Sequence, residues 1–268
     1  MAETQYPHCD LALSRRLELC EAKSNASFVE SRARLEPASG AAWLEYGGAY
    51  AMFDGAGSPL TQTFGFGVAS PPSEEVLLRL EEFLEARGAQ PFHEVSPLSG
   101  NEALAILGGQ GYRPVEVTSV LYRPLPASLE PGEVPARVAA PDEVQSWAET
   151  AAEGWSELAE VSALMHDLAR VTASSSGTTP FFAEVDGRPV ATGALAMHDG
   201  VALLAGASTV PSARNRGAQG ALLEARLRHA SEAGCDLAMM CAYPGSTSQK
   251  NAERQGFRVA YTRVKWGR

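Results

Sequence analysis

The second half of the chain contains the segment Ser208-Thr-Val-Pro-Ser-Ala-Arg-Asn-Arg-Gly-Ala-Gln-Gly-Ala-Leu-Leu223. The apolar residues before it, at 201–210, predict a strand. Residues 217–233 predict a helix that ends at Gly234, because glycine is the usual residue just after a helix C-terminus. The segment is therefore expected to form a strand, a short turn and the start of a long helix.

The turn in this segment combines positive charge with glycine. A helix N-terminus presents unpaired N–H groups and a partial positive charge. Arg214 and Arg216 add fixed charge, and Gly217 and Gly220 let a ligand approach the main chain. These features predict a pyrophosphate site. An ordinary strand–helix turn with solvated arginines is the alternative, whereas a Walker-type nucleotide site is disfavoured because no Gly-Lys-Ser/Thr follows.

Charge is distributed unevenly along the 268 residues. The net charge of −10 excludes a chain-wide basic surface for nucleic acid. Residues 214–268 carry 10 basic and 4 acidic groups, whereas residues 1–130 and 131–213 each have a net charge of −8. A local positive field attracts phosphates even in an acidic protein. The acidic segments favour a cationic amine as the acceptor.

The four cysteines contain no CxxC pair and no metal-ligand spacing, so we expect reduced thiols, no metal site and a cytoplasmic protein. The first 30 residues contain no apolar core of a signal peptide. No apolar run approaches the roughly 20 residues that a membrane span needs. We therefore expect neither a membrane nor a nucleic acid as a partner.

A linker near the middle of the chain predicts two domains. Residues 123–135 hold four prolines and a glycine, which can continue neither a helix nor a central strand. The predicted domains are residues 1–130 and residues 131–268.

The two halves share an order of elements. Gln110-Gly-Tyr-Arg113 matches Gln255-Gly-Phe-Arg258 at an offset of 145 residues. The long helix of each half ends in a glycine, Gly88 or Gly234, at an offset of 146. Each half then runs through a strand, a turn, a short helix and a final strand. This shared order predicts a tandem duplication.

Residues 131–268 resemble the GNAT superfamily of N-acetyltransferases. The family's acetyl-CoA motif, Gln/Arg-x-x-Gly-x-Gly/Ala, is matched by Arg214-Asn-Arg-Gly217-Ala-Gln219, with Gln219 as a departure. Gly256-Phe257 matches a second family landmark. The resemblance implies an α/β (α+β) fold of two tandem GNAT-like domains, each a mixed, mostly antiparallel sheet flanked by helices. The N-terminal turn at 69–75 has two carboxylates and neither glycine nor arginine, so this copy is expected to be degenerate and not to bind CoA.

The resemblance also implies acetyl-CoA as the co-substrate. The pyrophosphate would contact main-chain N–H groups of 214–220, and the pantetheine arm would pair with 208–210. A backbone N–H near Ser208 to Val210 would face the thioester carbonyl. The expected cofactor-binding residues are Ser208, Thr209, Val210, Arg214, Asn215, Arg216, Gly217, Ala218, Gln219, Gly220 and Asn251.

The general acid is less well defined. Many GNAT enzymes have a tyrosine four residues before the glycine of the Gly-Phe landmark, and this chain has Ala252 there. Ser248 and Asn251 share one helix face, and either could bond the CoA sulfur. Both could instead cap or bridge the backbone. Tyr243, at the end of a predicted strand, is expected to face the acyl group or to be an edge residue of the core.

The candidate general base is Glu184, with His198 as a second candidate. Glu184 alternates with Phe182 along a predicted strand, so its side chain points to a cleft or to solvent. Solvent is the simpler expectation for both residues, because His198 precedes the predicted Asp199-Gly200 turn.

The predicted activity is acetyl transfer from acetyl-CoA to a primary amine of a small-molecule acceptor by direct attack. The alternatives are a non-catalytic acyl-CoA-binding module and a tandem-GNAT acyl or aminoacyl transferase. A homodimer is a further expectation. The acceptor itself is not named by the sequence, because loops decide it.

Overall fold

A computed structural model describes residues 5–126 and 135–268, so most of the predicted linker lies outside the described residues. The chain divides into two compact units. Unit 1 comprises residues 1–124 and 239–268, and unit 2 comprises residues 125–238. The predicted domains 1–130 and 131–268 follow the chain in order, whereas the last 30 residues group with the first 124.

Six strands of unit 1 are neighbours in the order β1-β2-β3-β4-β11-β5, within a sheet of 11 strands. Only the β3–β4 pair is parallel among these neighbours. The C-terminal strand β11 lies between β4 and β5, with Val264 opposite both Val95 and Val117. This pairing is why the end of the chain belongs to unit 1. The strands are β1 (Ala42–Tyr46), β2 (Ala49–Phe53), β3 (Gln62–Phe64), β4 (His93–Val95), β5 (Arg113–Pro124) and β11 (Arg258–Gly267).

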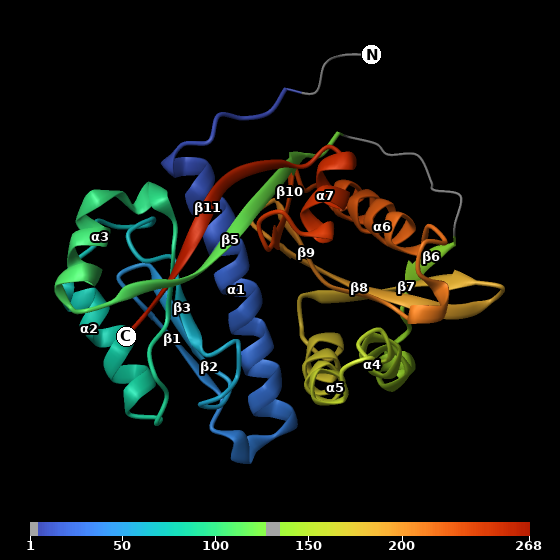
Figure 1. Cartoon of the computed structure of the whole chain (residues 1–268), viewed down its shortest axis with the longest axis horizontal. Coiled ribbons are helices and arrows are strands. Elements are labelled where there is room, and N and C mark those ends of the chain that lie inside the picture. The colour runs from blue at the N-terminus through green and yellow to red at the C-terminus, as the bar shows by residue number, and fades with distance from the viewer. Residues whose placement is uncertain (1–4, 127–134) are drawn as a thin grey trace. The chain divides into compact units, whose positions relative to one another are not determined.

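Helices flank the strands of unit 1 (Figure 1). They are α1 (Leu11–Leu35), α2 (Glu74–Glu85), α3 (Gly100–Gly109) and α7 (Thr247–Arg254). On α2, Leu77, Leu80 and Leu84 are fully buried, a spacing that places them on one helix face. Ser73 caps this helix by accepting a hydrogen bond from the Val76 N–H, as the sequence predicts.

Unit 2 contains an antiparallel meander in the order β6-β7-β8-β9. Its strands are β6 (Ala136–Val138), β7 (Thr178–Val185), β8 (Arg188–His198) and β9 (Val201–Thr209). Asp186-Gly187 and Asp199-Gly200 form the two hairpin turns, with φ positive at all four residues. Two successive positive φ angles are the requirement of a type I′ hairpin turn.

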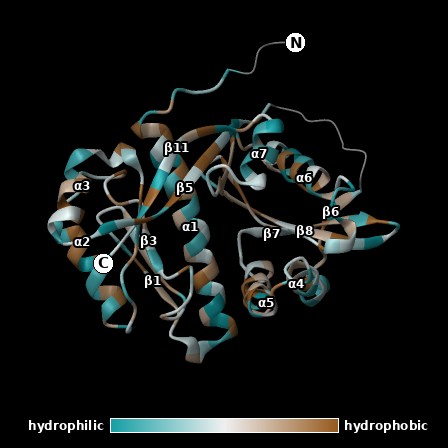
Figure 2. Ribbon diagram, in the orientation of Figure 1, coloured by the Kyte–Doolittle hydropathy of each residue, from teal (hydrophilic) through white to brown (hydrophobic). Residues whose placement is uncertain are grey.

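Figure 1 shows α6 (Ala218–Glu232) on one face of this meander, and α4 (Val144–Glu153) and α5 (Ala159–Ala173) on the other. Trp147 on α4 is buried and donates from Nε1 to the Phe181 carbonyl at 2.9 Å. Apolar residues gather along the strands and the helix sides that face them (Figure 2). Strand β10 (Leu237–Ala242) crosses the boundary between the units.

The repeated sequence segments adopt the same local geometry. Gly111 and Gly256 have φ of 83° and 79°, and each follows a short helix and precedes a long strand. The next residues, Tyr112 and Phe257, each donate a backbone bond of 3.0 Å to the carbonyl five positions earlier. The two helix ends at Gly88 and Gly234 likewise match, with φ of 73° and 86°. These matches support the predicted duplication.

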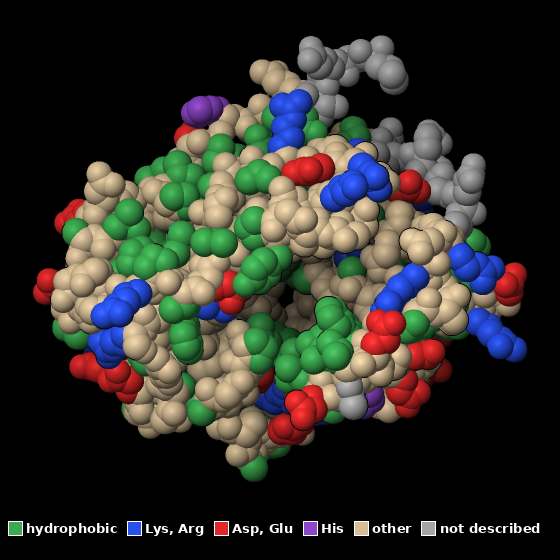
Figure 3. Space-filling model, in the orientation of Figure 1, with side chains coloured by type: hydrophobic (Ala, Val, Ile, Leu, Met, Phe, Trp, Pro, Cys, Tyr) green, Lys and Arg blue, Asp and Glu red, His purple; other side chains and the backbone are tan. Residues whose placement is uncertain are grey.

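On the face shown in Figure 3, Lys and Arg side chains lie beside Asp and Glu side chains. Among the helices of residues 5–126 and 135–268, none combines the length and apolarity required to cross a membrane.

Candidate functional site

The second half of β9 is an open strand segment with a bulge. Ala194 on β8 is opposite Ala205, whereas Thr192 is opposite Ser208, so β9 has one extra residue between these pairs. Gly206 lies in this bulge with φ of 60°. Ala205, Gly206 and Ala207 are exposed in succession, although a strand normally alternates between its two faces.

The turn after β9 leaves the start of α6 uncapped. Gly217 precedes α6 in the left-handed conformation, with φ of 83°, and Asn215 is also left-handed. Within the described part of the chain, no side chain caps the first turn of α6. The residues from Arg214 to Gly217 are exposed. The predicted turn is therefore accessible, with its helix N–H groups available to an anion.

Helix α2, the N-terminal counterpart of α6, has the opposite character. Ser73 occupies its N-cap and bonds an N–H of the first turn, and Glu74 and Glu75 place two carboxylates there. Both features compete with a phosphate for the positive end of the helix. This contrast supports the predicted loss of the CoA site in the first copy.

Both arginines of the turn contact carboxylates of unit 2. Arg214 donates to Glu157 Oε2 and to the Gly154 carbonyl, each at 2.9 Å. Arg216 reaches Asp186 Oδ2 at 3.4 Å, and the Asp186 side chain is 85% exposed. An exposed pair of this kind contributes about 0–1 kcal/mol. Arg216 can therefore exchange its partner for a phosphate more readily than Arg214 can.

Side chains at the end of β9 make local contacts. Gln219 Nε2 donates to Thr209 Oγ1 at 2.6 Å, which joins the strand end to the helix start. Ser208 Oγ donates to the Ala151 carbonyl at 2.8 Å. The Val210 N–H donates to the Val190 carbonyl at 2.9 Å. The Val210 amide is thus engaged, which removes one of the predicted donors to a thioester carbonyl.

The predicted acid candidates lie in unit 1. Tyr243 follows β10 and is 62% exposed. Ser248 and Asn251 lie on α7 and are exposed. Ala252, the residue after Asn251, is 2% exposed. The capping role belongs to Ser246, which accepts from the Gln249 N–H at 3.2 Å.

Gln249 was not predicted, yet it organises the loop before α7. Its Oε1 accepts from the Gly245 N–H at 2.9 Å and from Ser119 Oγ at 3.3 Å. Its place three residues after a serine that caps the helix is the sequence signal that could have indicated it.

Glu184, the predicted base, is part of an ion-pair network near the β6 edge of unit 2. Arg137 Nε donates to its carboxylate at 2.8 Å, and Arg137 Nη1 bonds Glu143 at 2.6 Å. The Arg137 hydrogen bond, with a further bond from the Ala140 N–H, lowers the pKa of Glu143 to about 2. His198 ends β8 at the hairpin turn.

A buried group of charged residues in unit 1 was also missed. Arg263 on β11 bonds Glu21 at 2.6 Å and Glu94 at 2.9 Å, and lies 3.4 Å from Glu18. Tyr261 donates to Glu18 at 2.7 Å. We call Glu18, Glu21, Glu94, Tyr261 and Arg263 the buried charge cluster.

Ionisation within the buried charge cluster is uneven. Burial raises the pKa of Glu18 to about 7 despite the opposing charge of Arg263. Burial acts in the same direction on Glu21, but Arg263 outweighs it, so the pKa of Glu21 is lowered. Cys241 donates to Glu21 at 3.3 Å, and burial raises the pKa of its thiol. A charged pair spaced at i, i+3 on an otherwise apolar helix face is the signal that Glu18 and Glu21 offer in the sequence.

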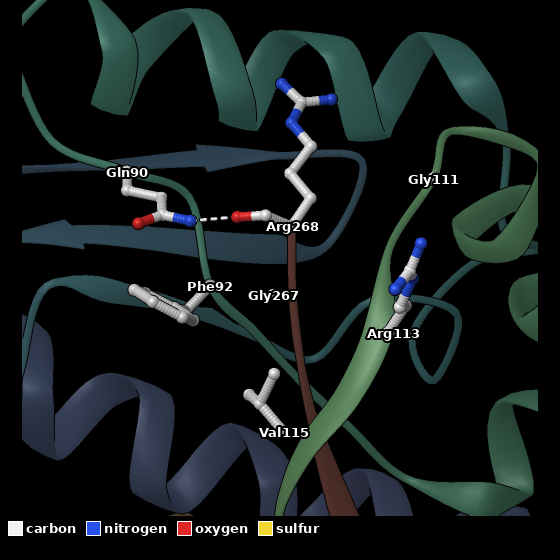
Figure 4. A pocket seen from close by; sticks show the side chains of 7 residues that line it. All are labelled: Gln90, Phe92, Gly111, Arg113, Val115, Gly267 and Arg268. Atoms are coloured by element: carbon white, nitrogen blue, oxygen red, sulfur yellow. Dashed lines mark hydrogen bonds between the residues drawn. The ribbon is translucent and has the colours of Figure 1, made fainter.

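Unit 1 contains a hollow of about 480 Å³. Figure 4 shows the residues that line it. The Gln90 amide donates to the main-chain carbonyl of Arg268 there. Arg268 also bonds Glu85 at 2.7 Å, so its charge is compensated. The hollow is lined by Gln90, Phe92, Gly111, Arg113, Val115, Gly267 and Arg268.

Residues 142–257 match the model of the acetyltransferase (GNAT) family. No curated protein matches the sequence. This range contains β9, the turn and α6, so the resemblance seen in the motif is confirmed for this part of the chain.

Three solved structures are similar in fold. A GCN5-related N-acetyltransferase from Kribbella flavida is 20% identical, with 94% of each chain covered and a TM-score of 0.64. A GCN5-related N-acetyltransferase from Sphaerobacter thermophilus is 17% identical, with 93% of this chain and 91% of that chain covered and a TM-score of 0.51.

A tandem GNAT protein from the clavulanic acid biosynthesis pathway is 14% identical, with 98% of this chain and 97% of that chain covered and a TM-score of 0.56. The predicted fold class is confirmed by this similarity, which extends over both halves of the sequence.

Proposed function

Because residues 142–257 match the model of the acetyltransferase (GNAT) family, we propose that this protein transfers an acetyl group from acetyl-CoA to a primary amine of a small-molecule acceptor. The observation that carries the proposal is the uncapped start of α6 beside an exposed strand. The left-handed Gly217 opens the helix, and no side chain among the described residues caps its first turn with a hydrogen bond.

The residues of this turn fit a pyrophosphate. The first-turn N–H groups of α6 offer hydrogen bonds, and the helix dipole favours an anion there. Arg216 supplies an exchangeable charge, because its bond to Asp186 is long and exposed. The strand segment at 205–207 is exposed and offers main-chain groups to an extended pantetheine arm.

Direct transfer forms one bond and breaks another. The amine nitrogen bonds the acetyl carbon while the carbon–sulfur bond breaks, and the electron pair of that bond leaves on sulfur. Nitrogen loses one proton and the sulfur gains one. We propose Tyr243, Ser248 and Asn251 as candidates for bonding the sulfur, since all three are exposed. The proposal does not use Glu184, because Arg137 holds its carboxylate.

The acceptor is proposed to be cationic. Helices α4 and α5, on the face opposite α6, carry Glu149, Glu153 and Glu160 in exposed positions. A field of one sign attracts the opposite charge to a site. Trp155 and Leu158 lie in the connection between α4 and α5 and are 42% and 59% exposed. Their apolar side chains could contact an apolar part of the acceptor.

Gly220→Ala tests the ligand site. A methyl group at Gly220 would meet no atom within 4 Å, and alanine favours a helix by up to about 1 kcal/mol. We expect the free protein to melt at a higher temperature. If the pyrophosphate approaches this turn, the same methyl group would crowd it and reduce the thermal stabilisation by acetyl-CoA.

Gly108→Ala on α3 is the matched control, because a methyl group there also meets no atom within 4 Å. It should leave the acetyl-CoA shift unchanged. A stronger disruption, Arg216→Glu with Gly217→Glu, should abolish the shift. An undiminished shift in both the alanine variant at 220 and the double variant would refute the ligand site.

The non-catalytic alternative has one observation in its favour. Ala252 is buried where many GNAT enzymes have a tyrosine, so that acid is missing. Release of CoA from acetyl-CoA, corrected for hydrolysis, separates the alternatives when it is measured with a panel of primary amines. Amine-dependent release supports the transferase. Tight acetyl-CoA binding without such release would identify a binding module.

A further inference from the structure

Arg226 on α6 is a buried arginine that serves the main chain. Only 3% of the surface of Arg226 is exposed. Nε donates to the Leu222 carbonyl at 3.1 Å, and Nη1 donates to the carbonyls of Ala194 at 3.1 Å and Ala205 at 3.2 Å. Among the described residues, no carboxylate forms an ion pair with it. A buried charge of this kind is costly unless its hydrogen bonds are satisfied.

Two glycines adapt the strands to this guanidinium. A methyl group on Gly193 of β8 would lie 2.9 Å from Arg226 Cζ, so a larger residue there would displace the guanidinium from this position. Gly206 adopts the positive φ that the β9 bulge requires. Ala194 and Ala205, whose carbonyls Arg226 bonds, are the paired residues that flank the bulge. The guanidinium therefore fixes the point at which the β8–β9 ladder is interrupted.

The geometry of the peptide decides where the next N–H points. The Ala205 carbonyl is directed to Arg226, and the Ala205–Gly206 peptide is trans. In a planar trans peptide the C=O and N–H point in opposite directions. The Gly206 N–H therefore points away from Arg226. Gly206 and its two neighbours are exposed.

We propose that Arg226 is a positioning residue for acyl transfer: it holds the β9 bulge and polarises the Ala205–Gly206 peptide, so that the Gly206 N–H donates to the acyl carbonyl oxygen. This inference rests on the proposed function. It replaces the predicted donors at 208–210 with a donor at the bulge.

The physical basis is a charge-assisted hydrogen bond in a poorly hydrated place. A charged donor on a carbonyl strengthens the dipole of that peptide, and the effect passes to the N–H at its other end. Burial lowers the pKa of Arg226 to about 10, which leaves the guanidinium charged at neutral pH. A donor prepared in this way stabilises the negative oxygen that develops when the amine attacks.

The test measures the carbonyl stretch of bound acetyl-CoA labelled with ¹³C at the acetyl carbonyl, by infrared difference spectroscopy. In the wild-type protein the stretch should move to lower frequency on binding. Arg226→Met should lose much of that displacement while the affinity for CoA, which lacks the carbonyl, stays the same. A displacement of equal size in Arg226→Met would overturn the proposal.

Arg228→Met on the same helix is the matched control, because the Arg228 side chain is 28% exposed and pairs only loosely with Glu232. It should keep the full displacement. If Arg226→Met does not fold, Arg226→Lys decides, since one ammonium bonds fewer carbonyls and should give an intermediate displacement. An unchanged displacement in the lysine variant would equally count against the proposal.

A measurement on the wild-type protein needs no variant. The Gly206 amide proton should shift downfield when acetyl-CoA is added, and should not do so with CoA. The absence of this difference refutes the role of Gly206. Failure of the proposed function is a separate outcome: no primary amine would then release CoA from acetyl-CoA, whereas the carbonyl displacement is measured on bound acetyl-CoA without any acceptor.

Discussion

Gln219 stands where the GNAT motif has Gly or Ala, and its side chain bonds the Thr209 hydroxyl. The motif position could be recognised from the sequence, but this bond could not, because it depends on how the strand end and the helix start meet. Arg214 and Glu184 are comparable. Each was predicted from its position along the chain, and each is held by a partner distant in sequence, Glu157 for Arg214 and Arg137 for Glu184.

Glu18 should make the free energy of unfolding depend on pH. Its pKa of about 7 exceeds the usual value of 4.5, so the folded protein binds a proton that the unfolded chain releases. The stabilisation is complete below about pH 4.5 and is lost as the pH rises to about 7. Glu18→Gln should therefore gain stability relative to wild type over this interval, by up to about 3 kcal/mol.

Urea denaturation at pH 4.5, 6 and 8 measures this difference. Glu45→Gln, on an exposed carboxylate of β1, controls for the removal of one negative charge. A difference that does not grow between pH 4.5 and 7 would mean that Glu18 is ionised in the folded protein.

At the scale of elements, local chemistry determined what could be predicted. The helix start at Ser73 and the hairpin turns at Asp186-Gly187 and Asp199-Gly200 depend on residues a few positions apart, and the structure confirms them. The bulge in β9 was missed. Gly206 is its only local mark, and a bulge is fixed by the register against β8, which a single strand does not reveal.

The Asp186-Gly187 hairpin leads to a prediction about ligand affinity. Asp186 competes with a phosphate for Arg216, at 3.4 Å. Asp186→Asn removes the charge, and Asn-Gly preserves the turn because asparagine tolerates the positive φ of 54°. We expect tighter binding of CoA by a few-fold, since an exposed pair contributes at most about 1 kcal/mol.

Isothermal titration with CoA at low and high salt checks this expectation, because the gain should shrink as salt screens the charges. Asp199→Asn changes the other hairpin aspartate in the same way and serves as the control. Equal affinities for wild type and Asp186→Asn would separate Arg216 from the phosphate site.

At the scale of the whole molecule, the sequence predicted two copies of one fold and placed the last strand in the second copy, 131–268, whereas this strand pairs with β4 and β5 of unit 1. The pattern of 257–266 identifies a strand, and its partners β4 and β5 are about 150 residues away. The positive segment 214–268 is also divided: residues 239–268 hold six of its ten basic groups and lie in unit 1. Of these, Arg263 and Lys265 bond carboxylates there instead of adding charge to the turn.

Arg263 should contribute strongly to the stability of unit 1. It joins the last segment of the chain to Glu18, Glu21 and Glu94 of the first. Arg263→Leu would leave these carboxylates buried without their partner, and removing one partner of a buried pair costs about 3–5 kcal/mol. The free energy of unfolding, measured in urea at pH 7, should fall by that order.

Arg254→Leu, an exposed change on α7, should have little effect. Adding Glu18→Gln to Arg263→Leu should recover part of the loss, because one buried negative charge is then removed. If Arg263→Leu is as stable as wild type, the buried charge cluster does not hold the end of the chain in unit 1.

The position of β11 between β4 and β5 has a consequence for synthesis on the ribosome. Unit 2 is one continuous stretch, so its meander can form while the chain is still growing. Unit 1 must wait for residues 258–267, and until they emerge β4 and β5 each lack a neighbour. Unpaired strand edges attract other chains. Unit 1, which is translated before unit 2, can therefore finish folding only after unit 2. Nascent chains should depend on chaperones until residues 258–267 have emerged.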